Sequence, residues 1–243
     1  MKRIDCLPGA MSAEMTYVLH FAPDNASLIV RLALDHAGLP YQTRLVDRAA
    51  RAQETAAYRA LNPNGLIPTL ETPHGVLFET GAILLWLADT HGGLGPAPDD
   101  PGRGNWLKWL FFVANTVHPA LRMTFYPDKY TGTDRRDQAR LRQHLQTQLA
   151  DHLSRLNDAA ADWQHNAPTV LDFYIAACLR WCVLYPVDTD RSWFDLSSYP
   201  ALHATCLRVE TLPACAMLMR AEGLGDTPFT APRAPTPPYG SAT

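Results

Sequence analysis

The stretch from residue 62 to residue 80 holds the groups best suited to bind a ligand. Pro68 stands where a strand is expected to begin, a place that proline rarely occupies because it cannot donate to the ladder. A cis bond before Pro68 would turn the backbone groups of Ile67 outward, where an extended peptide can pair with them. Glu79 and Thr80 open an apolar helix, and the free N–H groups of a helix start favour a carboxylate. The stretch therefore predicts a pocket for a peptide that carries a thiol.

Hydrophobic patterning places this stretch at the end of a small α/β domain. The first strand is expected at 16–21, where the side chains alternate, and Ser27 is expected to cap a helix that ends at Gly38. The later elements are a strand at 41–46, a short helix at 49–61, a hairpin of strands at 67–71 and 76–79, and a buried helix at 82–88. The order β-α-β-α-β-β-α predicts helices on both sides of a small mixed sheet.

The chain after residue 104 has the pattern of an all-α domain. Residues 91–104 are rich in Gly, Pro and Asp and predict a linker. Beyond it, an apolar-faced helix is expected at 106–124, and leucines at spacings of three and four mark a buried stripe at 141–156. Thr169 and Asp172 form a capping box before a further apolar helix. We therefore predict an α/β domain at 15–92, a helical bundle domain at 104–224, and extended or disordered ends at 1–14 and 225–243.

Length and composition argue against several classes of partner. The 243 residues are 47% hydrophobic, enough for a sizeable core, and the net charge of −3 argues against nucleic acid or an anionic membrane. There is no apolar run of the roughly 18 residues that a membrane-spanning helix needs. The first residues include Lys2 and Arg3 but no apolar core of a secretory signal, so a cytoplasmic location is expected.

The five cysteines and nine histidines indicate neither disulfides nor a metal. The odd number of cysteines, without a C-x-x-C pair, indicates reduced thiols in the cytosol. Cys178 and Cys182 lie one helical turn apart on an apolar helix and are interpreted as core residues rather than a redox pair. The histidines do not form an H-E-x-x-H or similar ligand set, so no metal site is predicted.

These motifs together resemble the cytosolic glutathione transferase family, and in particular its bacterial beta class. The resemblance rests on Asn62-Pro63-x-Gly65-x-Ile67-Pro68, Glu79-Thr80 with the following Ala82-Ile83-Leu84, Thr169-x-x-Asp172 and Tyr199-Pro200-x-Leu202. It runs from about residue 17 to about residue 223. It implies a thioredoxin-like N-terminal domain that binds glutathione, a C-terminal helical bundle that lines the acceptor pocket, and a homodimer.

The resemblance gives the first pocket its expected contacts. Ile67, ahead of a cis-Pro68, would pair its backbone with the cysteinyl part of glutathione. Glu79 and Thr80 would hold the γ-glutamyl amine and carboxylate, and Arg51 would face the glycyl carboxylate. Each contact has an ordinary alternative, because an acid–hydroxyl pair caps helices in many proteins and Arg51 fits a solvated face equally well.

An acceptor pocket is implied on the first long helix of the second domain. His118 falls at a pocket-facing position of the family, and Asn115, Arg122 and Tyr126 share its face through three- and four-residue spacing. With aromatic residues nearby, this face would suit an electrophile that carries an aromatic and a polar group. The same residues, His118 included, fit an ordinary domain interface or core as well.

Catalysis in this family rests on ionising the glutathione thiol, because a free thiol with a pKa of about 8.5 is only slightly ionised at neutral pH. The donor that lowers this pKa normally follows the first strand, where this chain has Ala26 in place of the beta-class cysteine. Ser27 is the preferred donor because it begins a helix, although it also fits a plain helix cap, and Asn25 is the second candidate. Asp24 would repel a thiolate and is expected to point away.

The function implied is that of a transferase with glutathione as substrate and a small hydrophobic electrophile as acceptor, acting in detoxification. A glutathione-dependent lyase or isomerase is an alternative, because it would share the first pocket. A non-catalytic binding or scaffold protein is another, favoured by Ala26 and by Phe111 and Pro119, which replace polar residues of the family. The intact peptide-binding stretch argues for retained ligand binding.

Overall fold

The computed structural model describes residues 17–240. The predicted end at 1–14, with Cys6, the predicted domain start at residue 15 and the last three residues of the chain lie outside the described residues. The N-terminal elements are β1 (Tyr17–Phe21), α1 (Ser27–His36), β2 (Tyr41–Leu45), the 3₁₀ helix η1 (Ala52–Glu54), α2 (Ala56–Leu61), β3 (Thr69–Thr72), β4 (Gly75–Phe78) and α3 (Thr80–His91). The C-terminal elements are α4 (Arg103–Phe112), the π-helix η2 (Val113–Val117), α5 (His118–Phe125), α6 (Asp128–Thr131), α7 (Arg135–Asp158), α8 (Ala160–Trp163), α9 (Val170–Leu184), the 3₁₀ helix η3 (Leu196–Ser198), α10 (Pro200–Glu210) and α11 (Pro213–Glu222).

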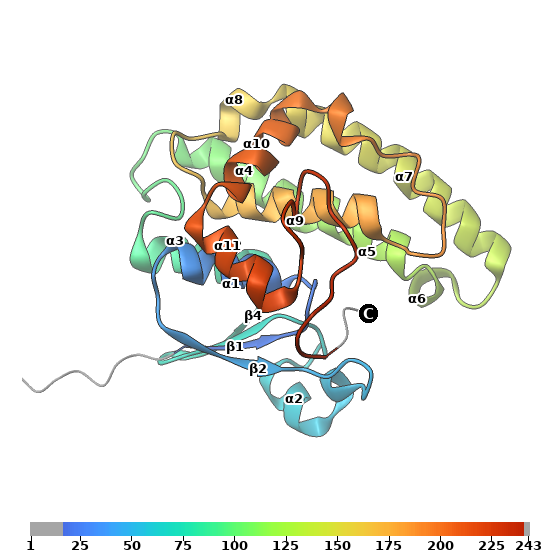
Figure 1. Ribbon diagram of the computed structural model, residues 1–243, viewed down its shortest axis with the longest axis horizontal. Coiled ribbons are helices and arrows are strands. Elements are labelled where there is room, and N and C mark those ends of the chain that lie inside the picture. Colours follow the sequence, from blue (N-terminus) through green and yellow to red (C-terminus); the bar gives the residue numbers. More distant parts are fainter. Residues whose placement is uncertain (1–16, 241–243) are drawn as a thin grey trace, which may run out of the picture.

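The four strands form one mixed sheet in the order β2-β1-β3-β4. Strand β1 pairs parallel with β2 and antiparallel with β3, and β3 pairs antiparallel with β4. Leu19 of β1 and Leu70 of β3 are paired and fully buried, so they anchor the sheet in the core. Helices α1 and α3 lie on one side of the sheet and α2 lies on the other (Figure 1). The predicted fold class, a thioredoxin-like α/β domain followed by an all-helical region, is confirmed.

Three local predictions about the first domain were wrong. Strand β3 begins at Thr69 rather than at Ile67, because Pro68 offers no N–H to the ladder. The expected helix at 49–61 is interrupted by the left-handed backbone of Arg51, with φ of 53°, so α2 begins only at Ala56. Ser27 is not a cap but the first residue of α1, and no side chain caps that helix.

The predicted long helix of the second domain is a continuous helical run made of α4, η2 and α5. Its π-helical turn lies just before Pro119, which contributes no N–H to the helix ladder. The predicted leucine stripe of α7 is buried from Leu145 to Leu156, as expected for a helix that packs on one face. Within the part of the chain that the structure describes, no helix is both long enough and apolar enough to cross a bilayer.

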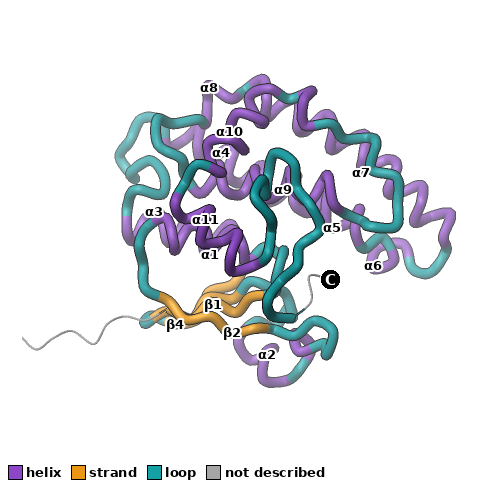
Figure 2. The backbone as a smooth tube through the Cα atoms, in the orientation of Figure 1, coloured by secondary structure: helices purple, strands orange, loops and turns teal. Residues whose placement is uncertain are grey.

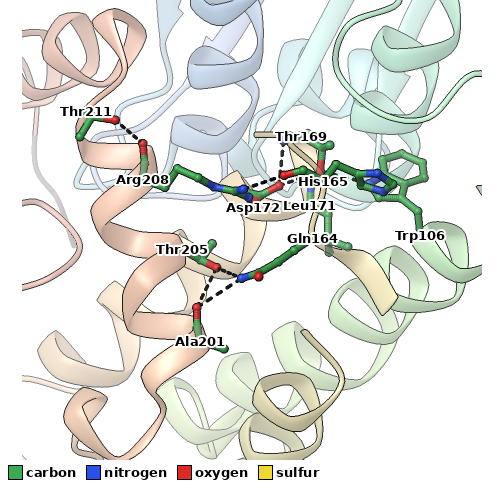
Figure 3. Close-up of polar contacts among 10 residues, drawn as sticks. All are labelled: Trp106, Gln164, His165, Thr169, Leu171, Asp172, Ala201, Thr205, Arg208 and Thr211. Carbon is green, nitrogen blue, oxygen red and sulfur yellow. Dashed lines mark hydrogen bonds and ion pairs between the residues drawn. The ribbon is translucent and has the colours of Figure 1, made fainter. Parts of the chain in front are cut away.

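Helix α9 runs through the middle of the helical region and is buried for almost its whole length (Figure 2). The predicted capping box at its start is confirmed, with the Thr169 N–H donating to Asp172 Oδ2 at 2.8 Å. Trp106 of α4 donates to Thr169 Oγ1 at 3.1 Å, and Arg208 of α10 pairs with Asp172 (Figure 3). Polar bonds at the start of α9 therefore hold three helices together.

Residues 225–240 form an extended tail that descends from α11 past α9 to β2 (Figure 1). Phe229 of the tail is fully buried, and its N–H donates to the Glu210 carboxylate at 2.7 Å. The N–H of Thr236 donates to the carbonyl of Gly223 at 2.9 Å. Gly223 permits this contact, because a Cβ there would lie 2.0 Å from the Thr236 carbonyl oxygen. The tail is thus packed against the helices rather than loose.

Replacing Thr169 by Ala is expected to lower the free energy of unfolding by about 1–2 kcal/mol, because it removes a helix cap and leaves the buried Trp106 N–H unpaired. Urea denaturation measures the change. Thr147→Ala is the matched control, since Thr147 is exposed on α7 and its hydroxyl bonds only within that helix. Equal losses in the two variants would contradict the role given to the cap.

Candidate functional site

A cavity of about 890 Å³ lies where the sheet domain meets the helices. Its walls come from the β1–α1 loop, the segment before β3, the start of α3, and the helical elements α4 to α6 and α9. This volume is within the usual range for a small-molecule site. All the predicted acceptor residues and most of the predicted glutathione-binding residues belong to the wall.

The segment before β3 presents unpaired backbone to the cavity. The peptide bond between Ile67 and Pro68 is cis, as predicted, and both residues line the wall. Between residues 17 and 240, the backbone of Ile67 has no hydrogen-bond partner. The preceding carbonyl, of Leu66, is fixed by the Tyr58 hydroxyl and the Asn62 amide, each at 2.8 Å. The backbone of Ile67 is therefore held in place and open to an extended ligand.

Helix α3 begins at the same wall. Glu79 stands before its first turn with φ of 70°, is exposed, and makes no capping hydrogen bond. Thr80 is the first helical residue and is buried. The N–H groups of the first turn have no partners within the helix, and the helix dipole favours a negative group beside them.

Asp24, in the β1–α1 loop, has a left-handed backbone with φ of 48°, which a residue with a side chain keeps only when its surroundings hold it. Its N–H donates to Glu222 Oε2 at 2.9 Å. Its carboxylate accepts from Arg180 at 2.8 and 3.0 Å, from Trp181 Nε1 at 3.1 Å and from the Tyr185 hydroxyl at 2.7 Å. The carboxylate is therefore directed at α9, and its charge is balanced there.

The Arg180 side chain has no exposed area and joins three parts of the chain. Besides Asp24, it donates to the carbonyl oxygens of Pro228 at 2.9 Å and Arg233 at 3.1 Å, both in the tail. Burial and the Asp24 carboxylate raise the pKa of Tyr185, so its hydroxyl stays protonated and donates. The conformation of the β1–α1 loop thus depends on α9 and on the tail.

Glu222 of α11 supports the same loop from inside the protein. It is fully buried and accepts from the Asp24 N–H and from Arg31 Nε at 3.0 Å. Burial raises the pKa of Glu222 to about 7, and Arg31 offsets this only in part. A buried carboxyl group therefore titrates near neutral pH directly behind the cavity wall.

The position of Ser27 contradicts its prediction as the thiol donor. Its hydroxyl is fully buried, donates to the Ala22 carbonyl at 3.0 Å and accepts from the Ala22 N–H at 3.3 Å. Ser27 does not line the cavity, whereas its neighbours Asn25 and Ala26 do. Because the buried hydroxyl uses its proton to close the turn after β1, it has no proton to donate to a ligand.

Asn25 remains as the predicted donor in this loop. It lines the cavity, and its buried Oδ1 has no hydrogen-bond partner in the range 17–240. Buried amide groups normally have partners, so an unpaired one at a cavity wall is an expected place for a ligand contact. The free amide also carries two N–H groups, which are able to donate to an anion.

His118 lines the cavity from α5 and is fixed by a neighbour on α9. Its Nδ1 lies 2.7 Å from the Tyr174 hydroxyl, and its ring centre lies 5.4 Å from that of Trp181. Burial, with a smaller effect from the Arg122 charge, lowers the pKa of His118 to about 4. The imidazole is therefore neutral at physiological pH. Tyr174 also interacts with Thr80, so the chain His118–Tyr174–Thr80 connects the two halves of the cavity.

The other predicted acceptor residues, Asn115, Arg122 and Tyr126, also line the cavity. The Tyr126 hydroxyl accepts from Arg48 Nη2 at 2.8 Å, and Arg48 is itself part of the wall. Arg51, the predicted glycyl partner, is not in the wall: its side chain is 74% exposed and pairs with Glu54. Sequence reasoning missed Arg48, because both arginines belong to the same polar stretch and the sequence pattern does not say which one faces the cavity.

Comparisons with known proteins find similarity to glutathione S-transferases and to a related isomerase. Residues 26–90 match the family model described as the N-terminal domain of glutathione S-transferase. Glutathione S-transferase GST-4.5 of Xanthomonas campestris is 29% identical over 214 residues, which are 85% of this chain and 98% of the relative. Maleylacetoacetate isomerase of Rhizobium meliloti is 29% identical over 200 residues, which are 79% of this chain and 90% of the relative.

The fold comparison agrees with the sequence comparison. The solved structure of a sphingomonad glutathione S-transferase complexed with glutathione superposes with a TM-score of 0.70 at 29% identity. The match covers 86% of this chain and 100% of that chain. The family-model match, the relatives and the solved structure together support a glutathione S-transferase family for this chain.

The raised pKa of Glu222 predicts how stability depends on pH. Its carboxyl group binds a proton more tightly in the folded chain than in the unfolded chain, where the pKa is near 4.5. Its contribution to stability is therefore full below pH 4.5 and is lost as the pH rises through about 7. Over this range the wild-type protein is expected to lose more stability than Glu222→Gln, which does not titrate, in urea denaturation at a series of pH values. Parallel pH profiles would contradict this assignment.

Proposed function

We propose that the protein is a glutathione transferase that binds glutathione in the cavity and promotes attack of the thiolate on an electrophilic small molecule. The observation that carries the proposal is the wall formed by Ile67 and Thr80, where unpaired backbone and a helix start flank a cavity of about 890 Å³. The transferase relative and the sphingomonad structure complexed with glutathione support the same ligand.

Glutathione matches this wall group by group. Its cysteinyl backbone would pair with the N–H and C=O groups of Ile67, as an added strand pairs with a sheet edge. Its γ-glutamyl amine would meet Glu79, and the neighbouring carboxylate would meet Thr80 and the first N–H groups of α3. We assign the glycyl carboxylate to Arg48 instead of Arg51, because only Arg48 lines the cavity.

The thiol would then face the β1–α1 loop. Two features there favour the thiolate: the positive end of α1 and the N–H groups of the Asn25 amide, which lines the cavity. Ala26 offers no thiol, and the four cysteines of the described chain are all buried. The chemistry is therefore attack by the glutathione thiolate itself rather than exchange with a protein cysteine.

Two other functions compete with the transferase. A glutathione-dependent isomerase or lyase would use the same first pocket, and the maleylacetoacetate isomerase relative favours this possibility. A non-catalytic scaffold is favoured by Ala26, Phe111 and Pro119. The cavity argues against the scaffold, because its wall presents the unpaired amide oxygen of Asn25 and the unpaired backbone groups of Ile67.

We further propose that the protein is a cytoplasmic homodimer that acts in detoxification, as membership of the family suggests. One surface residue supports association: Phe111 of α4 is 49% exposed beside the cavity. A second copy that covered this ring would remove its apolar surface from water.

Calorimetric titration with glutathione tests the binding. The wild-type protein is expected to bind, and Arg48→Ala is expected to raise the Kd about tenfold or more, because hydrogen bonds to charged groups contribute about 1.5–3 kcal/mol. Arg51→Ala is the matched control and is expected to bind like the wild type, since its side chain lies outside the wall. Absence of heat at millimolar glutathione would leave only the scaffold. Equal effects of the two substitutions would contradict the role of Arg48.

Asn25→Ala tests the activation of the thiol. Loss of one donor to the thiolate is expected to raise the pKa of bound glutathione by about one unit and to lower kcat about tenfold. Ultraviolet absorbance of the thiolate, recorded against pH, measures the pKa. Ser27→Ala is the comparison: it is expected to reduce stability, because it breaks the contacts to Ala22, without shifting that pKa. An unchanged thiol pKa in Asn25→Ala would rule out Asn25 as the donor.

A further inference from the structure

One part of the cavity wall carries cations that the protein itself does not neutralise. Arg122 of α5 and Lys129 of α6 both line the cavity. In the chain from 17 to 240, neither forms an ion pair with a carboxylate. Their contacts are with phenol groups, since Arg122 Nη1 donates to the Tyr130 hydroxyl and Lys129 Nζ lies 4.7 Å from the ring centre of Tyr126. A phenol orients a cation but does not balance its charge.

Three carboxylates of the described chain lie near the cavity, and none of them pairs with Arg122 or Lys129. Asp24 accepts from Arg180 with both oxygens, so its charge is already balanced. Glu79 stands at the start of α3, in the wall assigned to glutathione. The Glu54 carboxylate accepts its hydrogen bond from the Arg51 side chain, which lowers the pKa of Glu54, and the charge of Lys129 contributes to the lowering. The wall around Arg122 and Lys129 is therefore positive.

Glutathione does not account for these two cations. In the proposed binding mode its amine meets Glu79, and its two carboxylates meet the start of α3 and Arg48. Arg122 and Lys129 then remain as positive groups beside the space left for the acceptor. The Arg122 charge reaches into the cavity, because it contributes to the low pKa of His118, which lies in the same wall.

We propose that the acceptor is an anion: an aromatic or unsaturated electrophile whose carboxylate is bound by Arg122 and Lys129. Its apolar body would pack against Phe125, Trp181 and Tyr185, which line the same cavity. Guanidinium and ammonium groups with free N–H groups bind carboxylates through charge-assisted hydrogen bonds. The inference rests on the proposed function, since the reacting carbon must face the glutathione thiol.

The test uses two acceptors, a chloronitrobenzoate, which is an anion, and its neutral methyl ester. Because the ester group activates the ring more than the carboxylate does, each kcat/KM is divided by the rate constant of the uncatalysed reaction of that acceptor with glutathione. With either, the thiolate attacks the ring carbon that bears chlorine, the new C–S bond replaces the C–Cl bond, chloride leaves with the bonding electrons, and the thiol proton passes to the buffer. The wild-type kcat/KM is expected to be about tenfold or more higher for the acid. The preference is expected to disappear in the Arg122→Met/Lys129→Met double variant and to persist in Arg136→Met, an exposed arginine of α7 outside the cavity.

Equal kcat/KM values for acid and ester in the wild type, after division by the uncatalysed rate constants, would overturn the proposal, and so would a preference that survives in the double variant. Calorimetry distinguishes failure of the anion site from failure of the proposed transferase function. Titrations with nitrobenzoate and its methyl ester, which lack a leaving group, are made with and without glutathione. Tighter binding of the acid, lost in the double variant, supports the anion site even if glutathione does not bind or react. Equal binding of the two overturns the site even if glutathione binds well.

Discussion

Arg180 donates two hydrogen bonds to Asp24 in a place that water does not reach, and removing either partner would leave an uncompensated charge in the core. The same guanidinium holds two carbonyl oxygens of the tail. Because Asp24 keeps a left-handed backbone only under such restraint, the pair determines the path of the loop that carries Asn25 and Ala26 into the cavity. The geometry of this part of the cavity wall is thus set from the helical region.

The two halves of the cavity are built in different ways. Most of the wall proposed for glutathione comes from one continuous stretch, in which the Tyr58 and Asn62 side chains fix the backbone just before Ile67, and the β2–α2 loop adds Arg48. The half proposed for the acceptor is assembled from α4 to α6 and α9, which meet only in the folded chain. The first half therefore follows from local sequence, whereas the second depends on how helices pack.

Features that depend on local sequence could be predicted, whereas features that depend on the folded arrangement could not. The cis bond before Pro68, the start of α3 and the capping box at Thr169 were predictable because each depends on residues close together in the chain. The orientation of Ser27 was not, since its hydroxyl could face a ligand or the turn behind it, and only the backbone path selects the turn. The choice of Arg48 over Arg51 likewise depended on the path of the β2–α2 loop, which composition does not reveal.

The order in which the chain is synthesised gives the Asp24 contacts a further consequence. Arg180 follows Asp24 by 156 positions and Glu222 by 198, so both leave the ribosome long after the first domain. Until then the Asp24 carboxylate has only water to solvate it, and nothing holds the left-handed turn. A nascent chain that has folded its first domain already has the backbone of Ile67 beside the start of α3. The contacts that order its β1–α1 loop form only when the last helix and the tail have emerged.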